Sequence, residues 1–264
     1  MDILKKEGFA GVRDLGERLY ASQPTIRRDL DFLEKEGLVR RSHGGAVPAD
    51  DRVNTPISYR KGRRMHEKMQ IAALAATLIE NDQFIFIDGS TTALCLADFL
   101  AEHEGISVLT NGMPLCHALA KQSVRVFCTG GRLDGESMAF VGSMAQGSVE
   151  SHYADLMFFS SSSLSEDGMI SDYAEEENAL RLAMHKNSRC TVFLCDSEKW
   201  QSRSAFCLLA LQAVDYTVTD RPLSDTLCRL QGLELVRQSE GAYMYGHAMN
   251  TQKGEKTSEE PISE

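Results

Sequence analysis

The stretch Ser22-Gln23-Pro24-Thr25-Ile26-Arg27-Arg28-Asp29-Leu30 has the pattern of the first turns of an amphipathic helix. Ser22 is a typical N-cap, because its hydroxyl can accept a hydrogen bond from a backbone N–H of the first turn. Pro24 falls within that turn, where a missing N–H donor costs little. Apolar residues then recur at i, i+4 and i+7, which predicts a buried stripe of Ile26, Leu30 and Leu33.

The polar residues of this stretch lie off the predicted stripe. Arg27 and Arg28 place two cations near the helix N-terminus, beside the hydroxyl of Thr25, where the phosphates or base edges of DNA could meet them. Ser22 and Gln23, at the start of the helix, are further candidates for DNA contact. Taken alone, however, the nine residues favour an ordinary amphipathic helix with solvated arginines, so the flanking residues must decide.

The residues before the stretch predict two more helices. A short helix is expected over residues 2–7, and the spacing of Val12, Leu15 and Leu19 marks a second one. The turn over residues 20–22 then leads directly into the third helix. Two helices joined by so tight a turn, the second with basic residues at its start, are typical of a helix-turn-helix.

The residues after the stretch predict a wing. Gly37 is a natural C-cap for the third helix, and residues 38–47 combine β-type residues, a basic pair and a Gly-Gly turn. In such a hairpin Arg40, Arg41 and His43 would lie where a wing meets backbone phosphates. A plain β-turn with surface charges is the alternative, but the hairpin follows the recognition helix without a gap, which favours the wing.

The charge of the chain is uneven. The net charge of −10 argues against nucleic acid when taken for the whole chain of 264 residues. Residues 1–47, however, hold 9 Lys+Arg against 8 Asp+Glu, a net charge of +1, and the remainder holds 19 against 30, a net charge of −11. Residues 38–70 hold 8 basic against 3 acidic residues, a net charge of +5. This local basic zone keeps DNA binding open.

The seven cysteines are scattered, at positions 95, 116, 128, 190, 195, 207 and 228, and no C-x-x-C pair occurs. This usage is typical of reduced, mostly buried thiols rather than of a disulfide framework or a zinc site. The N-terminus has no apolar signal segment and no run approaches a membrane span. We therefore expect a cytoplasmic protein without a membrane partner.

The rest of the chain alternates between strand and helix patterns after a linker expected over residues 49–65. Strands are expected at 84–87, 106–109, 124–128, 155–160, 190–195, 214–218 and 233–236. Helices are expected from residue 66 to about 79 and at 91–101, 113–121, 144–149, 175–186 and 223–230. Repeated βα units predict an α/β domain over residues 66–247 with a mostly parallel sheet. The polar tail, residues 248–264, is expected to be disordered.

Ligands of such sheets bind beyond the carboxyl ends of the strands, so the residues that follow each strand matter most. Asp88 and Gly89 follow the first strand, and Gly89 allows a tight turn. Ser90, Thr91 and Thr92 then offer three hydroxyls beside free helix N–H groups, which suits a phosphate. Simple capping of the helix by Ser or Thr is the alternative, but three hydroxyls after a glycine exceed what a cap needs.

Later strands are followed by similar candidates. Thr110, Asn111 and Gly112 follow the second strand, and Thr129, Gly130 and Gly131 follow the third. Both turns permit a ligand to approach the backbone closely, although each is also an ordinary βα turn. Lys199, after the strand at 190–195, could pair with a phosphate or a sugar oxygen. Asp172, Glu176 and Glu177 could bind sugar hydroxyls or could be the acidic first turn of the next helix.

The sequence resembles the DeoR-type transcriptional regulators. The run Thr25–Leu30 followed by His43-Gly44-Gly45-Ala46 is similar to the family's DNA-binding signature. Ile87–Thr92, Leu109–Asn111 and Asp196–Lys199 are similar to its C-terminal sensor. The resemblance implies a winged helix-turn-helix joined to a sensor whose fold is like that of sugar-phosphate isomerases and coenzyme A transferases. It further implies a repressor, usually of sugar-utilisation genes, released by a phosphorylated sugar.

We therefore expect a repressor that binds double-stranded operator DNA and is relieved by a phosphorylated sugar. It should form a dimer or tetramer, because one winged helix buries too little surface for tight operator binding. No cofactor motif, nucleophile elbow or metal-ligand spacing occurs, so we expect no cofactor, metal or catalytic residue. The alternative is a sugar-phosphate isomerase-like enzyme that carries a DNA-binding domain, with Asp88, Glu176 and Lys199 as acid/base groups.

Overall fold

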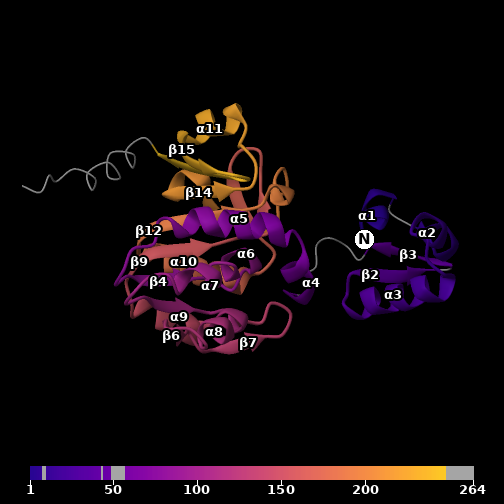
Figure 1. Cartoon of the computed structure of the whole chain (residues 1–264), viewed down its shortest axis with the longest axis horizontal. Coiled ribbons are helices and arrows are strands. Elements are labelled where there is room, and N and C mark those ends of the chain that lie inside the picture. Colours follow the sequence, from indigo (N-terminus) through magenta and orange to yellow (C-terminus); the bar gives the residue numbers. More distant parts are fainter. Residues whose placement is uncertain (8–9, 43, 49–56, 248–264) are drawn as a thin grey trace, which may run out of the picture. The chain divides into compact units, whose positions relative to one another are not determined.

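The computed structural model describes residues 1–7, 10–42, 44–48 and 57–247 (Figure 1). The chain divides into two compact units, Met1–Arg60 and Lys61–Glu264. The expected tail and residues 49–56 of the expected linker lie outside the described residues. Residues 57–62 of that linker form a helix, α4 (Ile57–Gly62), which the sequence did not predict.

The first unit is a winged helix-turn-helix. Its helices are α1 (Asp2–Glu7), α2 (Val12–Arg18) and α3 (Gln23–Lys35), and its hairpin is β2 (Val39–Ser42) with β3 (Gly45–Pro48). A two-residue strand, β1 (Ala10–Gly11), pairs with β3 and completes a three-stranded sheet in the order β1-β3-β2. The predicted helix-turn-helix and wing are both confirmed.

The core of this unit follows the predicted stripes except at Leu33, which is only partly buried, and at Leu19. Ile26 and Leu30 of α3 are buried, together with Leu4, Val12 and Leu15. Ser22 caps α3 as expected, with its Oγ 3.3 Å from the backbone nitrogen of Thr25. The prediction for Leu19 was wrong: α2 ends at Arg18, so Leu19 lies beyond the helix and is 56% exposed.

The second unit is built on an eight-stranded sheet in the order β15-β16-β14-β12-β9-β4-β5-β6. Its strands are β4 (Phe84–Ile87), β5 (Ser107–Thr110), β6 (Arg125–Cys128), β9 (Ala154–Phe159), β12 (Ser188–Cys195), β14 (Tyr216–Thr219), β15 (Leu233–Ser239) and β16 (Ala242–His247). The six strands from β14 to β6 are parallel, which confirms the expected fold. Only β15 and the unpredicted β16 are antiparallel.

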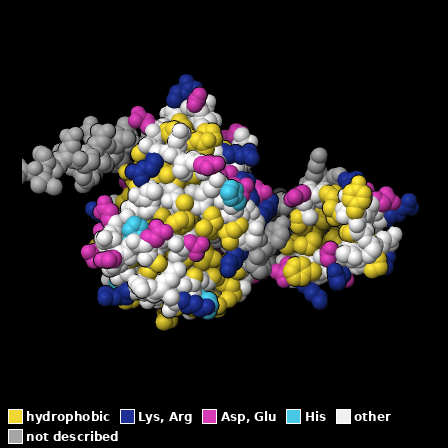
Figure 2. Space-filling model, viewed as in Figure 1, with side chains coloured by type: hydrophobic (Ala, Val, Ile, Leu, Met, Phe, Trp, Pro, Cys, Tyr) yellow, Lys and Arg dark blue, Asp and Glu magenta, His cyan; other side chains and the backbone are white. Residues whose placement is uncertain are grey.

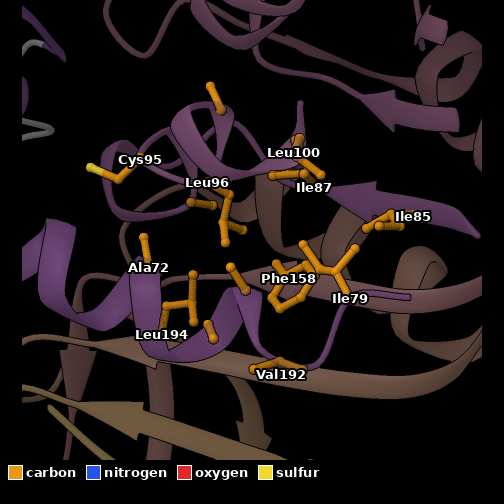
Figure 3. Close-up of a cluster of buried hydrophobic side chains, with 14 of the residues drawn as sticks. Ala72, Ile79, Ile85, Ile87, Cys95, Leu96, Leu100, Phe158, Val192 and Leu194 are labelled. Atoms are coloured by element: carbon orange, nitrogen blue, oxygen red, sulfur yellow. The ribbon is translucent and has the colours of Figure 1, made fainter. Parts of the chain in front are cut away.

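Helices cover both faces of this sheet, and adjacent residues of one strand contribute to different cores. Ile85 and Ile87 belong to a core with α5 (Met65–Ala76), α6 (Thr91–Leu94), α7 (Ala97–Leu100) and α8 (Met113–Leu119). Figure 3 shows this core, with Ile87 beside Leu100. Phe86 faces the opposite way, toward the core that includes α9 (Ser143–Glu150), α10 (Glu175–Lys186) and α11 (Asp225–Gln231).

Smaller elements lie in the connections between the strands of this sheet. A hairpin joins β7 (Arg132–Asp134) and β8 (Ala139–Val141), and a short sheet contains β10 (Ser163–Leu164), β11 (Met169–Asp172) and β13 (Phe206–Ala210). Two 3₁₀ turns, η1 (Ser197–Lys199) and η2 (Leu211–Ala213), follow β12 and β13. The helix predicted over 91–101 is broken into α6 and α7.

The seven cysteines are thiols rather than disulfides, and the expectation that most of them are buried was wrong. Only Cys95 and Cys195 are buried, whereas Cys128, on the edge strand β6, and Cys207, on β13, are exposed. Among the described residues, every helix is too short or too polar to cross a lipid bilayer.

Candidate DNA-binding helix and effector site

Helix α3 presents its basic residues to solvent. Arg27 and Arg28 are both exposed, and 81% of the Arg28 side chain is accessible. Ser22 and Gln23 are exposed as well, and the Ser22 Oγ lies 2.8 Å from the Oγ1 of Thr25. The residues predicted to contact DNA in α3 therefore share the outer side of the helix start, while the apolar stripe holds the helix in the domain.

The wing is tied to α3 through Arg41. The Arg41 backbone N–H donates to the Oε1 of Glu34 over 2.8 Å, and its guanidinium Nε lies 3.6 Å from the Oδ1 of Asp31. Arg41 is thus partly engaged by the recognition helix rather than fully turned to solvent. The Arg40 side chain and all of His43 lie outside the described part of the structure.

The second unit has a topological switch point between β4 and β9. From β4 the chain continues to β5 and β6 on one side of the sheet and returns to β9, β12 and β14 on the other. A polar residue directly follows each strand on this second path and at the switch itself: Asp88, Ser160, Asp196 and Asp220. The crevice at such a point is where open parallel sheets bind ligands.

Arg181 of α10 holds three carboxylates beneath this edge, and sequence reasoning missed it. Its guanidinium nitrogens lie 2.8 Å from Asp88, 2.9 Å from Asp172 and 3.0 Å from Glu177, and all four side chains are at least nine-tenths buried. Burial raises the pKa of the Asp172 carboxyl, but Arg181 and the hydrogen bonds from Ser162, Tyr173 and Ala174 together outweigh burial and lower that pKa. The signal was the position of Arg181 beside the buried residues Leu180 and Met184 of α10.

This network braces the two loops that flank the switch point. Asp88 also accepts a hydrogen bond from the backbone of Ser90 (3.2 Å), which shapes the loop after β4. Asp172 accepts hydrogen bonds from both the backbone (3.1 Å) and the hydroxyl (2.8 Å) of Ser162, in the loop after β9. The protein itself therefore occupies the carboxylates of Asp88, Asp172 and Glu177. The structure gives no support to direct binding of sugar hydroxyls by them.

Two lysines reach the same edge from different elements. Lys199 Nζ donates to Ser160 Oγ over 2.7 Å and lies 3.5 Å from Asp196 Oδ2. Lys68 Nζ, on α5, donates to Thr91 Oγ1 over 3.1 Å. Burial raises the pKa of Asp196, but Lys199, Lys68 and Arg64 together outweigh it and hold that pKa below its ordinary value. Arg64 also pairs with Asp220 and Glu67, so cations and carboxylates alternate along this edge.

The hydroxyls of the loop after β4 divide into two roles. Ser90 caps α6, with its Oγ accepting from the backbone of Ala93 at 3.2 Å, so this hydroxyl follows the simple capping alternative. Thr91 instead contacts Lys68. Thr92 Oγ1 and Asn111 Oδ1 are buried, and neither makes a hydrogen bond within the described part of the chain. Such orphaned acceptors at a strand edge are candidates for ligand contact.

The glycines of these loops serve loop packing. A Cβ on Gly112 would lie 2.8 Å from the Cα of Gly89, so the loops after β4 and β5 touch backbone to backbone. A Cβ on Gly131, which has φ +107°, would lie 2.7 Å from the carbonyl oxygen of Val141. Only Gly130, with φ +65°, has open space there. Thr110 supports the same region, since its Oγ1 accepts from the backbone of Gly112 at 3.0 Å.

The three acid/base groups that the enzyme alternative requires, Asp88, Glu176 and Lys199, each contact different side chains. Asp88 pairs with Arg181 in the buried network, and Lys199 donates to Ser160. Glu176 forms an ion pair with Arg132 and is 54% exposed. The three groups therefore share no partner, and the structure gives no support to their acting on one substrate.

Lys and Arg side chains lie on the surface of the first unit (Figure 2). A winged helix with outward arginines, joined to an α/β unit whose strand edge carries two lysines, defines a DNA-binding transcription regulator with a sensor domain. The chain belongs to the DeoR family of such regulators. Residues 1–52 match the DeoR-like helix-turn-helix domain, and residues 63–221 match the DeoR C terminal sensor domain. The family membership places the chain among transcription regulators rather than enzymes.

The chain is similar to several curated regulators over most of its length. It is 29% identical to the glycerol-3-phosphate regulon repressor of Escherichia coli strain K12, with 84% of this chain and 88% of that one covered. It is 33% identical to the uncharacterized HTH-type transcriptional regulator YulB of Bacillus subtilis, with 84% and 87% covered. It is 28% identical to the putative aga operon transcriptional repressor of E. coli O157:H7, with 88% and 89% covered.

Among solved structures, ribose 5-phosphate isomerase A from Neisseria gonorrhoeae is 12% identical, with a TM-score of 0.39 and with 69% of this chain and 75% of that chain covered.

Proposed function

We propose that this protein represses genes of sugar metabolism and releases its operator when a phosphorylated sugar binds the carboxyl edge of the sensor sheet. The observation that carries the proposal is the convergence of Lys68 and Lys199 on hydroxyls of that edge, Thr91 and Ser160. Each lysine donates to a neutral hydroxyl, and a phosphate oxygen in place of that hydroxyl would turn the contact into an ion pair with a hydrogen bond. A dianionic phosphate group would match this pair of cations.

The sugar end of the ligand has acceptors available beside these lysines. Asn111 Oδ1 and Thr92 Oγ1 are buried without a hydrogen bond to a described residue, so hydroxyl groups of a sugar would satisfy them. The proposed effector site comprises Asp88, Gly89, Ser90, Thr91, Thr92, Thr110, Asn111, Gly130, Gly131, Lys199 and, added by the structure, Lys68. Within it Asp88 and the glycines position the loops, and the lysines and hydroxyls contact the ligand.

The DNA-binding surface would be the outer side of α3 together with the wing. The proposed contacts are Ser22, Gln23, Thr25, Arg27, Arg28, Arg40, Arg41 and His43. One winged helix covers a single half-site, so we infer a homo-oligomer, a dimer or tetramer, acting in the cytoplasm. Effector and operator would favour different states of this oligomer, and each would weaken binding of the other by the same factor.

A thermal-shift screen of the full chain tests the effector site. The panel would contain ribose 5-phosphate, glucosamine 6-phosphate, glycerol 3-phosphate and inorganic phosphate, each with its unphosphorylated counterpart where one exists. A ligand present at about 100 times its Kd stabilises the folded state by about 2.7 kcal/mol. We expect one phosphorylated compound to raise Tm by several degrees and its unphosphorylated form to have no effect.

Variants then locate the response. Lys199→Ala and Thr91→Ala should abolish the Tm rise, whereas Lys186→Ala, a matched change at an exposed lysine of α10, should retain it. A response that survives Lys199→Ala, or the absence of any response to phosphorylated compounds, would reject the proposed site. Turnover of a sugar phosphate by the purified protein would revive the enzyme alternative.

A further inference from the structure

The segment that enters the sensor unit, residues 63–68, contacts three different loops of the carboxyl edge with three basic side chains. Arg63 forms an ion pair with Glu198 in η1 after β12. Arg64 forms an ion pair with Asp220 after β14, with NH2 and Oδ2 2.5 Å apart. Lys68 donates to Thr91 after β4. We name residues 63–68 the basic segment; it directly follows α4, through which the chain passes from the first unit to the second.

Arg64 is held in an unfavourable backbone conformation by these contacts. Its φ of 52° and ψ of 40° lie in the left-handed region, which is unfavourable for a residue that carries a Cβ. Its Nε is buried and makes no hydrogen bond among the described residues. Both features oppose this conformation, so the pairs to Asp220 and to Glu67 (3.2 Å) must maintain it.

Asp220 connects Arg64 to the loop that carries Lys199. Its carboxylate accepts hydrogen bonds from the backbone N–H of Ser197 (2.6 Å) and from the Ser197 hydroxyl (2.9 Å). Ser197, Glu198 and Lys199 form the single 3₁₀ turn η1. The basic segment is therefore attached to this turn twice, by Arg63 through Glu198 and by Arg64 through Asp220. The side chain of Asp220 is 2% exposed, so this attachment is weakly screened by solvent.

We propose that Arg63 and Arg64 form a latch that effector binding opens, so that the basic segment transmits the signal from the sensor toward the DNA-binding unit. The proposal rests on the proposed function, because it takes the anion to bind at Lys199. An anion there stands beside η1, where it competes with Glu198 and Asp220 for the two arginines and repels both carboxylates. Release of Arg64 would also relieve its left-handed backbone, which favours the open state.

A purely structural role for the two ion pairs is the competing explanation. In that case the pairs stabilise the sensor but do not respond to the ligand. The two explanations differ in what the basic segment does when the anion binds. Loss of the Asp220 charge favours anion binding under either explanation, so the response of the segment to the bound anion, rather than affinity, separates the two.

Hydrogen–deuterium exchange of the full chain provides the test. The probe is the phosphorylated compound of the panel above that raises the Tm of the wild type most. In the wild type we expect the probe to accelerate amide exchange of peptides covering residues 57–64 by roughly fivefold or more, the lower range of allosteric coupling factors. Asp220→Asn retains an oxygen for Ser197 but loses the charge that holds Arg64. In this variant the peptides covering residues 57–64 should exchange rapidly without the probe, and the probe should not accelerate their exchange further. Calorimetry should show that the variant binds the probe about fivefold more tightly than the wild type does.

Asp167→Asn is the matched control, because Asp167 also pairs with an arginine, Arg203, and accepts from a serine, Ser165. It should behave as the wild type in both measurements. The latch is overturned if the probe raises Tm while the 57–64 peptides stay unchanged or become more protected, or if Asp220→Asn keeps the wild-type response. Absence of a Tm rise with every phosphorylated compound overturns the proposed function, and the latch with it.

Discussion

Arg181 Nε and Asp88 Oδ2 lie 2.8 Å apart in the interior of the sensor unit, and this pair joins α10 to the loop after β4. The same guanidinium also pairs with Asp172 and Glu177, so one cation serves three carboxylates. Because Asp88 shapes the loop after β4 and Asp172 the loop after β9, the pairing couples the stability of the fold to the geometry of the proposed effector site. The loops that would bind the ligand are thus held from beneath rather than left to adapt.

Replacement of Arg181 should therefore be strongly destabilising. Arg181→Met would leave three buried carboxylates without their cation, and removal of one partner of a buried pair costs about 3–5 kcal/mol. Urea denaturation measures the loss, with Arg132→Met as the control. The Arg132–Glu176 pair is more than half exposed, so its loss should cost less than about 1 kcal/mol. Equal losses in the two variants would show that the Arg181 network adds no special stability.

Asp196 predicts the direction of a pH effect. The surrounding cations hold its pKa below the ordinary value despite burial. A carboxyl whose folded-state pKa is depressed stabilises the protein above its unfolded-state pKa of about 3.9, and this contribution disappears as the pH falls through the folded-state value. Asp196→Asn lacks it at every pH. The Tm of the wild type should therefore exceed that of Asp196→Asn at pH 7, and the difference should shrink in acid; a constant difference would contradict this origin.

Arg28 should supply one electrostatic contact to DNA. Its side chain is 81% exposed on the outer side of α3. Loss of one phosphate contact lowers the slope of log K against log salt by about 0.9. Fluorescence anisotropy with a short duplex of arbitrary sequence, at several salt concentrations, measures that slope for Arg28→Ala. Arg13→Ala, at an exposed arginine of α2 paired with Glu17, is the control and should leave it unchanged. An unaltered slope in Arg28→Ala would remove Arg28 from the phosphate contacts.

Gly112 should be intolerant of a side chain. Its Cβ would lie 2.8 Å from the Cα of Gly89, a distance that real Cβ atoms essentially never show, and the neighbour is backbone and cannot rotate away. Gly112→Ala should separate the loops after β4 and β5, lower Tm, and weaken the response to the probe. Gly147→Ala in α9, where a Cβ meets open space, should be neutral or stabilising. A fully retained ligand response in Gly112→Ala would show that this contact is not needed for binding.

The sequence determined the features that depend on neighbours along the chain. The Ser22 cap, the Ile26 and Leu30 stripe and the wing hairpin follow from local spacing, and the structure contains all three. The parallel strands were predictable because runs such as Phe84–Ile87 are apolar throughout, which is typical of strands buried on both faces. Lys199 was a candidate because it follows a strand. The antiparallel strand β16 was missed, since nothing in its own residues shows that they pair with β14 and β15.

Only the tertiary structure decided which side chains meet. Lys68 precedes Thr91 by 23 residues and Arg64 precedes Asp220 by 156, so no local spacing connects them. Gly89 suggested a tight turn and Gly112 the close approach of a ligand, yet the two glycines approach one another. Arg181 lies in a helix whose pattern is simply amphipathic, and two of its three partners, Asp88 and Asp172, come from other elements. Local sequence determines backbone conformation and burial, whereas the pairing of buried charges depends on how distant strand ends converge at one edge of the sheet.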